Sequence, residues 1–171
     1  RDAFDASLQG HITTCRTDLV LLHSNPNAEI IASEQQEYYE NYYTGGHTGI
    51  TNVHTYKIVA YKDIYPHIDF VLHSRGSGME YEFVVYPGGD VKNIQIQWNG
   101  FDRIEKMKGS GIKYFCSLGK MTESKLVSFQ GKNRIGSDFF KTANRIGFKT
   151  DKYDKNKTLV IDPTLVWGTY Y

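Results

Sequence analysis

The segment that most constrains the fold is residues 61–89, YKDIYPHIDFVLHSRGSGMEYEFVVYPGG. Apolar side chains occupy every second position of residues 68–72, and the same alternation returns in residues 79–85. The glycine-containing sequence RGSG separates the two runs, and turn-forming proline and glycine residues flank them. Alternation with a period of two on both sides of a glycine-rich break is typical of a β-hairpin. This segment therefore predicts two antiparallel strands.

Similar short runs, separated by turn residues, fill most of the chain. Because no long helical period occurs, they predict an all-β fold, an antiparallel β-sandwich or paired sheets of about ten short strands. We expect residues 1–14 to form an irregular lead-in and residues 15–171 a single domain, since 171 residues suit one domain with a core. Beyond the hairpin, strands are predicted at residues 14–23, 28–32, 53–61, 91–98, 104–108, 112–118, 121–130, 134–141, 145–150, 159–161 and 164–171.

Residues 33–43 are the exception, because their tyrosines have a helical spacing. The tyrosines follow one another at i, i+1, i+4 and i+5: Tyr38, Tyr39, Tyr42 and Tyr43. This spacing predicts at most one short helix, with Ser33 and Gln36 at capping-box positions. The tyrosines have two interpretations, a packing element on the sheet or, together with Trp98, an aromatic platform for a sugar or a peptide.

Charge and cysteine content narrow the possible partners. The chain has 20 Lys and Arg against 19 Asp and Glu, a net charge of +1, which gives no attraction to nucleic acid or to an anionic membrane. No apolar run is long enough for a membrane span. Cys15 and Cys116 are the only cysteines and lie far apart in sequence. They form either one long-range disulfide or two buried or half-buried thiols, and the sequence leaves both alternatives open.

The sequence contains no motif typical of catalysis, neither a G-x-S-x-G nucleophile elbow nor an H-E-x-x-H metal site. Asp63 and Asp69 resemble an acid–base pair in spacing, but turn and capping roles explain them better. Asp90 is a candidate calcium ligand, although an Asx turn after Pro-Gly-Gly is the simpler interpretation. His67 and His73 would lie roughly 20 Å apart on a straight strand, too far to share an ion. We therefore predict no catalytic residue and no cofactor.

The last predicted strand, residues 164–171, is rich in apolar and aromatic side chains. Aromatic side chains in this region are suited to a domain interface or, as an alternative, to stacking on sugars. We expect this strand to lead toward a downstream module of the same polypeptide. The expected contact residues are Leu165, Trp167, Tyr170 and Tyr171.

Four phrases in a fixed order resemble a known family. They are YKDIYPHID at residues 61–69, EYEFVVYPGGD at 80–90, IQIQWNG at 94–100, and LVIDPTLVWGTY at 159–170. Together they resemble the domain that precedes SBBP-type β-propeller repeats in large secreted or cell-surface bacterial proteins. The chain departs from that pattern in two ways. It lacks the family's first strands, with a phrase such as E-N-x-G-Q-W, and it stops where a propeller would begin, so we expect it to be a segment of a longer chain.

The resemblance implies an extracellular or cell-surface location in Bacteroidetes-type bacteria, where type IX secretion often accompanies such domains. It transfers no catalytic residues. The expected function is therefore that of a non-catalytic structural or adhesion module, with a downstream domain or another surface protein as partner. The alternative is a carbohydrate-binding module that uses the tyrosine-rich surface. An extracellular hydrolase is the third hypothesis, and it requires a pocket with convergent carboxylates or histidines.

Overall fold

The computed structural model describes residues 14–43, 49–75, 78–109 and 111–169. Within these ranges the chain forms thirteen strands and one short 3-10 helix, which confirms the predicted all-β class. Every strand pairing is antiparallel. The elements are β1 (Asp18–Leu21), β2 (Glu29–Tyr42), β3 (Ile50–Tyr65), β4 (Ile68–Arg75), β5 (Gly78–Val85), η1 (Val91–Asn93), β6 (Ile96–Asn99), β7 (Arg103–Lys106), β8 (Ile112–Cys116), β9 (Gly119–Gln130), β10 (Asn133–Ile135), β11 (Ser137–Thr142), β12 (Arg145–Thr150) and β13 (Leu159–Thr169).

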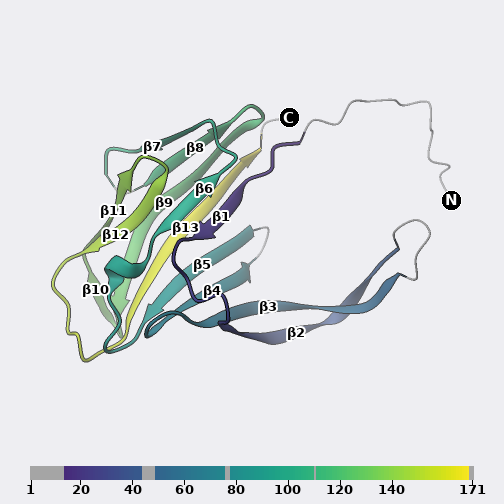
Figure 1. Ribbon diagram of the computed structural model, residues 1–171, viewed down its shortest axis with the longest axis horizontal. Coiled ribbons are helices and arrows are strands. Elements are labelled where there is room, and N and C mark those ends of the chain that lie inside the picture. Colours follow the sequence, from purple (N-terminus) through teal and green to yellow (C-terminus); the bar gives the residue numbers. More distant parts are fainter. Residues whose placement is uncertain (1–13, 44–48, 76–77, 110, 170–171) are drawn as a thin grey trace.

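The strands form two sheets that pack face to face (Figure 1). The smaller sheet has the strand order β1-β6-β12-β11. The larger sheet has the order β2-β3-β4-β5-β13-β9-β8-β7, and β10 adds to β9. The predicted hairpin is present as β4 and β5, which pair from Ile68↔Val85 to Arg75↔Gly78. It therefore forms the middle of the larger sheet, next to the C-terminal strand β13.

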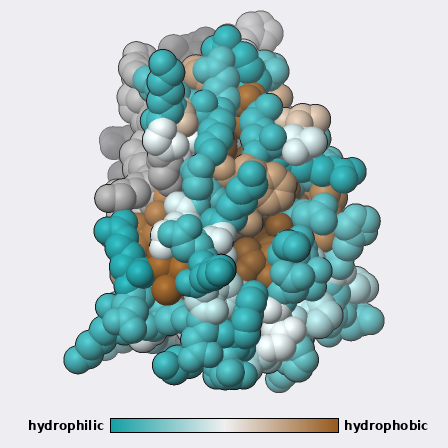
Figure 2. All heavy atoms as spheres, turned by 90° about the vertical axis from the view of Figure 1, so that its left-hand side faces the viewer, coloured by the Kyte–Doolittle hydropathy of each residue, from teal (hydrophilic) through white to brown (hydrophobic). Residues whose placement is uncertain are grey.

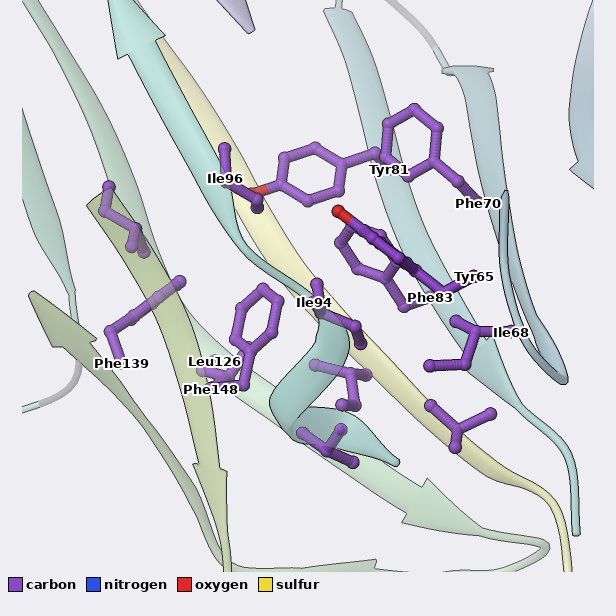
Figure 3. Packing of buried hydrophobic residues seen from close by; sticks show 14 of the residues in the cluster. Tyr65, Ile68, Phe70, Tyr81, Phe83, Ile94, Ile96, Leu126, Phe139 and Phe148 are labelled. Atoms are coloured by element: carbon purple, nitrogen blue, oxygen red, sulfur yellow. The ribbon is translucent and has the colours of Figure 1, made fainter. Parts of the chain in front are cut away.

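The core lies between the two sheets and is rich in aromatic rings. Figure 3 shows side chains from both sheets converging on this layer. Phe83 of β5 and Phe148 of β12 have ring centroids 5.7 Å apart, and Trp98 of β6 and Tyr114 of β8 have centroids 5.3 Å apart. Each pair joins one strand of the larger sheet to one of the smaller. Tilted aromatic pairs at such distances contribute roughly 0.5–1.5 kcal/mol beyond their burial, so these contacts fix how the sheets sit on each other.

Four sequence predictions were wrong in detail. The strand predicted at residues 134–141 is two strands, β10 and β11, which belong to different sheets. Residues 33–42 form part of β2 rather than a helix, because their backbone pairs with β3 and tyrosine suits a strand. Val91–Asn93 is a 3-10 turn instead of the start of a strand, since the Asp90 side chain caps it by accepting a hydrogen bond from the Lys92 N–H. The two strands predicted at residues 159–161 and 164–171 are one strand, β13, with a register shift between Pro163 and Leu165.

Candidate functional site

Most of β2 and the first part of β3 form a pair of strands that extends away from the two sheets (Figure 1). β2 is the edge strand of the larger sheet. The pairing of β3 with β4 begins at Ile58, so the described residues 50–57 have β2 as their strand partner. We call residues 29–43 and 49–57 the arm. For most of its length the arm is a two-stranded ribbon.

Two irregularities interrupt the pairing within the arm. Glu34 has a φ of 56°, and the register shifts between residues 35 and 39. Asn52 has a φ of 60°, and its N–H donates to the side-chain oxygen of Asn41 at 2.8 Å. Such irregularities bend a strand and break up its ladder of backbone groups. Among the described residues β2 has no strand on its outer edge, and these irregularities make that edge poorly suited to pairing with a further strand.

Large hydrophobic side chains are concentrated on the arm. Twelve such side chains are exposed among the described residues, and eight of them belong to the arm. They are Ile30, Ile31, Tyr38, Tyr39, Tyr42, Tyr43, Ile50 and Tyr56. Tyr43 and Ile50 are 74% and 69% exposed, close to full solvation. The face of the body that is turned to the viewer in Figure 2, by contrast, is mostly hydrophilic, with hydrophobic side chains visible only between polar ones. Exposed apolar patches are common at interaction sites, so the arm is the candidate site of this fold.

A cavity lies at the root of the arm. It has a volume of about 330 Å³ and is mostly apolar, with walls from β1, β3, β4, β5 and β6. Tyr61, Leu72 and Met79 belong to its lining. Ile30 of the arm pairs directly with Tyr61, so the two side chains lie on the same face of the sheet. The exposed Ile30 therefore continues the apolar surface from the cavity onto the arm.

Trp98 does not belong to the tyrosine surface, contrary to the sequence prediction. The arm carries all four of the predicted tyrosines, whereas Trp98 lies in β6, within the body of the fold (Figure 1). Its side chain is buried and packs against Phe101 and Tyr114 with ring centroids 5.6 Å and 5.3 Å away. The indole is therefore a core group that also contributes to the wall of the cavity.

A carboxyl group that the sequence analysis missed is buried in the core. The side chain of Glu123 is fully buried in β9, and its two oxygens accept hydrogen bonds of 2.8 Å from the hydroxyls of Tyr81 and Tyr114. Burial raises the pKa of Glu123 to about 7, although the two tyrosine hydrogen bonds act in the opposite direction. Burial and the nearby Glu123 charge also raise the pKa of Tyr81 well above its ordinary value. Without solvent contact, this group is a structural and pH-sensitive element of the core.

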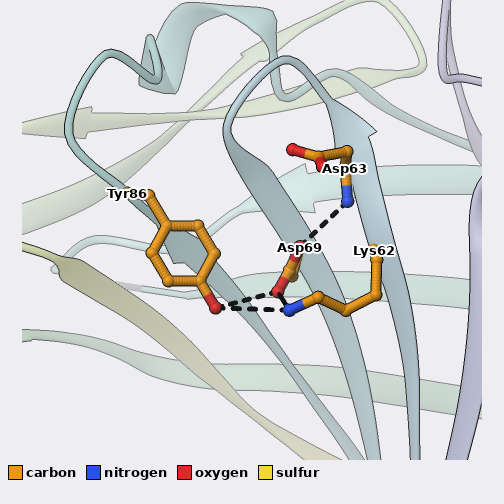
Figure 4. Close-up of polar contacts among 4 residues, drawn as sticks. All are labelled: Lys62, Asp63, Asp69 and Tyr86. Atoms are coloured by element: carbon orange, nitrogen blue, oxygen red, sulfur yellow. Dashed lines mark hydrogen bonds and ion pairs between the residues drawn. The ribbon is translucent and has the colours of Figure 1, made fainter.

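A second polar cluster joins β3, β4 and the residue after β5 (Figure 4). The Asp69 carboxylate forms an ion pair with Lys62, accepts the Tyr86 hydroxyl at 2.9 Å and accepts the Asp63 backbone N–H at 2.9 Å. Burial raises the pKa of Asp69, but the three hydrogen bonds outweigh it and leave that pKa below its ordinary value. Asp63 has a φ of 47° at a register shift between β3 and β4. The cluster thus holds a β-bulge, which is the capping role that the sequence analysis preferred for Asp69.

The remaining candidates for chemistry are dispersed. Asp90 caps the 3-10 turn, with its side-chain oxygen 3.0 Å from the Lys92 nitrogen. His67 is exposed in the β3–β4 turn, and His73 contacts Glu82 at 3.2 Å. In the part of the chain that the structure describes, no three His, Cys, Asp or Glu side chains are grouped to hold a metal ion. Nor does any helix in these residues have the length and hydropathy needed to cross a membrane.

The predicted interface residues fall partly outside the described chain. Leu165 and Trp167 belong to β13, where their backbones pair with Glu123 and Met121 of β9. Tyr170 and Tyr171 lie outside the described residues. The C-terminal strand is thus an inner strand of the larger sheet, between β5 and β9. Cys15 and Cys116 are both free and half-buried.

Comparison with known proteins places the chain in a family but gives it no activity. The model of a family described as a domain of unknown function, DUF7948, matches residues 2–164. No curated protein and no solved structure matches the chain. Because the family match covers nearly the whole two-sheet fold, including the arm and both polar clusters, the chain belongs to the DUF7948 family.

Proposed function

We propose that this domain is a non-catalytic interaction module of a larger secreted or cell-surface protein, and that the arm binds a partner protein. The observation that carries this proposal is the set of eight large hydrophobic side chains exposed on the arm. An isolated two-stranded ribbon is only marginally stable in water. A partner that covers the arm buries apolar area and orders the ribbon at the same time.

Both faces of the arm take part in this surface. Ile30 and Ile31 are neighbours in β2, so their side chains point to opposite faces of the sheet at the root of the arm, and both are exposed. The face that carries Ile30 continues into the cavity at the root of the arm, through Tyr61. A single apolar side chain of the partner fits a cavity of this kind as an anchor, the usual arrangement at the centre of a protein interface.

Charge indicates which partner surface suits the arm. β2 contains four glutamates, Glu29, Glu34, Glu37 and Glu40, and no lysine or arginine. Tyrosine rings attract cationic side chains through their π faces, and arginine stacks on them most often. The partner that best complements the arm is therefore a polypeptide surface with arginine or lysine around an apolar anchor. In keeping with the family resemblance, this surface belongs to a neighbouring domain of the same polypeptide or to another cell-surface protein.

A carbohydrate ligand is the second candidate, because exposed tyrosine rings such as those of Tyr38 and Tyr43 also stack on sugars. A hydrolase has less support. Of the two carboxylate clusters described above, one is sealed in the core and the other holds a bulge, so neither offers a convergent pair to a substrate.

Binding of peptides tests the proposal directly. The probes are fluorescent arginine-rich peptides with one central phenylalanine, and a matched set with glutamate in place of arginine. We expect the arginine set alone to raise the anisotropy, with an affinity that falls as salt increases. Tyr39→Ala with Tyr42→Ala should weaken binding at least tenfold, and Met79→Trp, which fills the cavity mouth, should do the same. Leu118→Ala, an exposed hydrophobic residue in the β8–β9 turn, is the matched control and should bind normally.

Equal binding of both peptide sets, or binding that survives the tyrosine and Met79 changes, would reject the arm as a protein-binding site. A glycan array separates the two candidates. A signal on the array that disappears with Tyr39→Ala and Tyr42→Ala would establish the carbohydrate alternative in its place.

The cellular context has its own tests. The full-length coding sequence should contain an export signal before this domain and repeats after it. If Leu165 and Trp167 contact the following module, the domain should melt at a higher temperature when that module is attached. Equal melting temperatures with and without the module would count against this contact.

A further inference from the structure

β1 pairs with β6 of the smaller sheet, and this pairing places the segment before β1 at one corner of the fold. Asp18 pairs with Asn99 at the end of β6, which places the residues before Asp18 next to the turn that follows β6. The sulfur of Cys15 lies 3.7 Å from the carbonyl oxygen of Gly100 in that turn. Cys15 therefore lies beside the turn through which the chain passes from β6 of the smaller sheet to β7 of the larger sheet.

Cys116 reaches the same corner from the larger sheet. Arg103 of β7 pairs with Phe115 of β8, and the Asp102 N–H donates to the Phe115 carbonyl oxygen at 2.8 Å. At one end of this turn Gly100 lies beside Cys15. At the other end Asp102 is hydrogen-bonded to Phe115, the residue before Cys116. Both cysteines therefore lie at this corner of the fold, and the nearby Cys116 raises the pKa of the Cys15 thiol.

We propose that Cys15 and Cys116 form a disulfide that links the segment before β1 to the end of β8. The bond would join the two sheets covalently at this corner. It would also secure β1, a strand of only four residues at the edge of the smaller sheet, whose one strand partner in the described residues is β6. Since β1 contributes Leu19 to the cavity wall, the bond helps to hold the root of the binding surface in shape.

The chemistry is a thiol–disulfide exchange with a small-molecule disulfide as the oxidant. One cysteine thiolate attacks the oxidant and forms a mixed disulfide, which releases one thiol. The second cysteine thiolate then attacks the protein sulfur of the mixed disulfide and releases the second thiol. The two cysteines lose two protons and two electrons, and the oxidant is reduced to two thiols.

The whole 171-residue chain can be tested in its folded state. After incubation with oxidised glutathione, we expect the count of free thiols to fall from two to none and the intact mass to show no bound glutathione. Peptide mapping without reductant should recover the peptides of Cys15 and Cys116 joined together. Because the bond closes a loop of about 100 residues, the unfolding equilibrium constant should fall on the order of a thousandfold, measured by urea titration with and without reductant.

Single Cys15→Ser and Cys116→Ser chains serve as controls, and each should keep one glutathione as a mixed disulfide. The same oxidation in urea separates proximity in the fold from chance, since the internal bond should form far less readily in the unfolded chain. Folded wild type that carries glutathione on both cysteines, or that forms only dimers linked between chains, would overturn the proposal.

Discussion

Glu123 and Tyr81 meet in the core between the two sheets, where the tyrosine hydroxyl lies 2.8 Å from a carboxylate oxygen. Tyr114 binds the other oxygen at the same distance, so each oxygen of the fully buried carboxyl group has a donor. The two hydroxyl donors favour the ionised carboxylate, but burial in the core makes ionisation unfavourable, and burial has the larger effect. The group therefore couples the stability of the fold to pH.

The first prediction concerns this coupling. The pKa of Glu123 is about 7 in the folded chain, against an ordinary value of 4.5. The folded state thus keeps a proton that the unfolded chain releases between these two values. The free energy of unfolding should therefore fall as pH rises through this window, by roughly 3 kcal/mol in total, and this contribution should level off above about pH 7. Urea titrations across this range measure the effect.

Glu123→Gln is the control for that titration, since the amide cannot ionise. Its stability should lack the decline between pH 4.5 and 7 that Glu123 contributes. An unchanged pH profile in this variant would mean that another group causes the dependence.

The second prediction concerns Asp69, whose pKa shift has the opposite sign. Because the pKa of Asp69 is lowered in the fold, its contribution is present above the ordinary pKa of 3.8 and is lost as pH falls through the lower, folded value. Asp69→Asn should cost about 1–3 kcal/mol at neutral pH, because the buried site loses its charge and its ion pair with Lys62. Chemical denaturation at pH 7 gives the number.

Asp90→Asn is the matched control for Asp69. Asparagine keeps the side-chain oxygen that accepts the Lys92 N–H, and Asn and Asp cap about equally well, so this change should have an effect within about 0.5 kcal/mol. If both variants lose the same stability, the loss reflects the removal of a carboxylate charge in general rather than the bulge held by Asp69.

The third prediction separates the arm from the core. Tyr38→Ala and Tyr43→Ala should each change the free energy of unfolding by less than about 0.5 kcal/mol, because both rings are mostly exposed. Phe139→Ala, at a fully buried position, should cost about 3–5 kcal/mol. A large loss from either tyrosine change would show that the arm tyrosines support the fold, and it would weaken their assignment to binding.

The sequence alone was sufficient to predict the two strands at the centre of the larger sheet, β4 and β5. The register of β4 and β5 follows from alternation, because a shift of one residue would turn Phe70 and Phe83 away from the core. The helix predicted over residues 33–43 failed because the tyrosine spacing fits either structure. Backbone pairing with β3, which is distant in sequence, selects the strand over the helix. A local sequence pattern does not contain that pairing.

The burial of Glu123 could not be predicted from the sequence, because β9 is an irregular strand. Alternation from Met121 points to Glu123 as an inner residue, yet Leu126 and Ser128 are also inner residues, and they have the opposite parity. Three steps along β9, from Glu123 to Leu126, match two steps along β13, so a bulge reverses the parity between them. Neither this bulge nor the shared corner of Cys15 and Cys116 has a local sequence signal. Both depend on pairings between distant strands.

The last prediction concerns Gly100, in the turn that follows β6. Gly100 has a φ of 87°, and a Cβ atom there would overlap the carbonyl oxygen of Arg16. Gly100→Ala should therefore cost on the order of 3 kcal/mol or more and should push the segment of Cys15 away from β8. Gly131→Ala is the matched control, since Gly131 also has a positive φ, 57°, but open space where the Cβ would be. It should cost only about 1–2 kcal/mol, the backbone penalty alone. If Cys15 and Cys116 meet because this turn is tight, Gly100→Ala should also slow the loss of free thiols under oxidised glutathione, whereas Gly131→Ala should leave that rate unchanged.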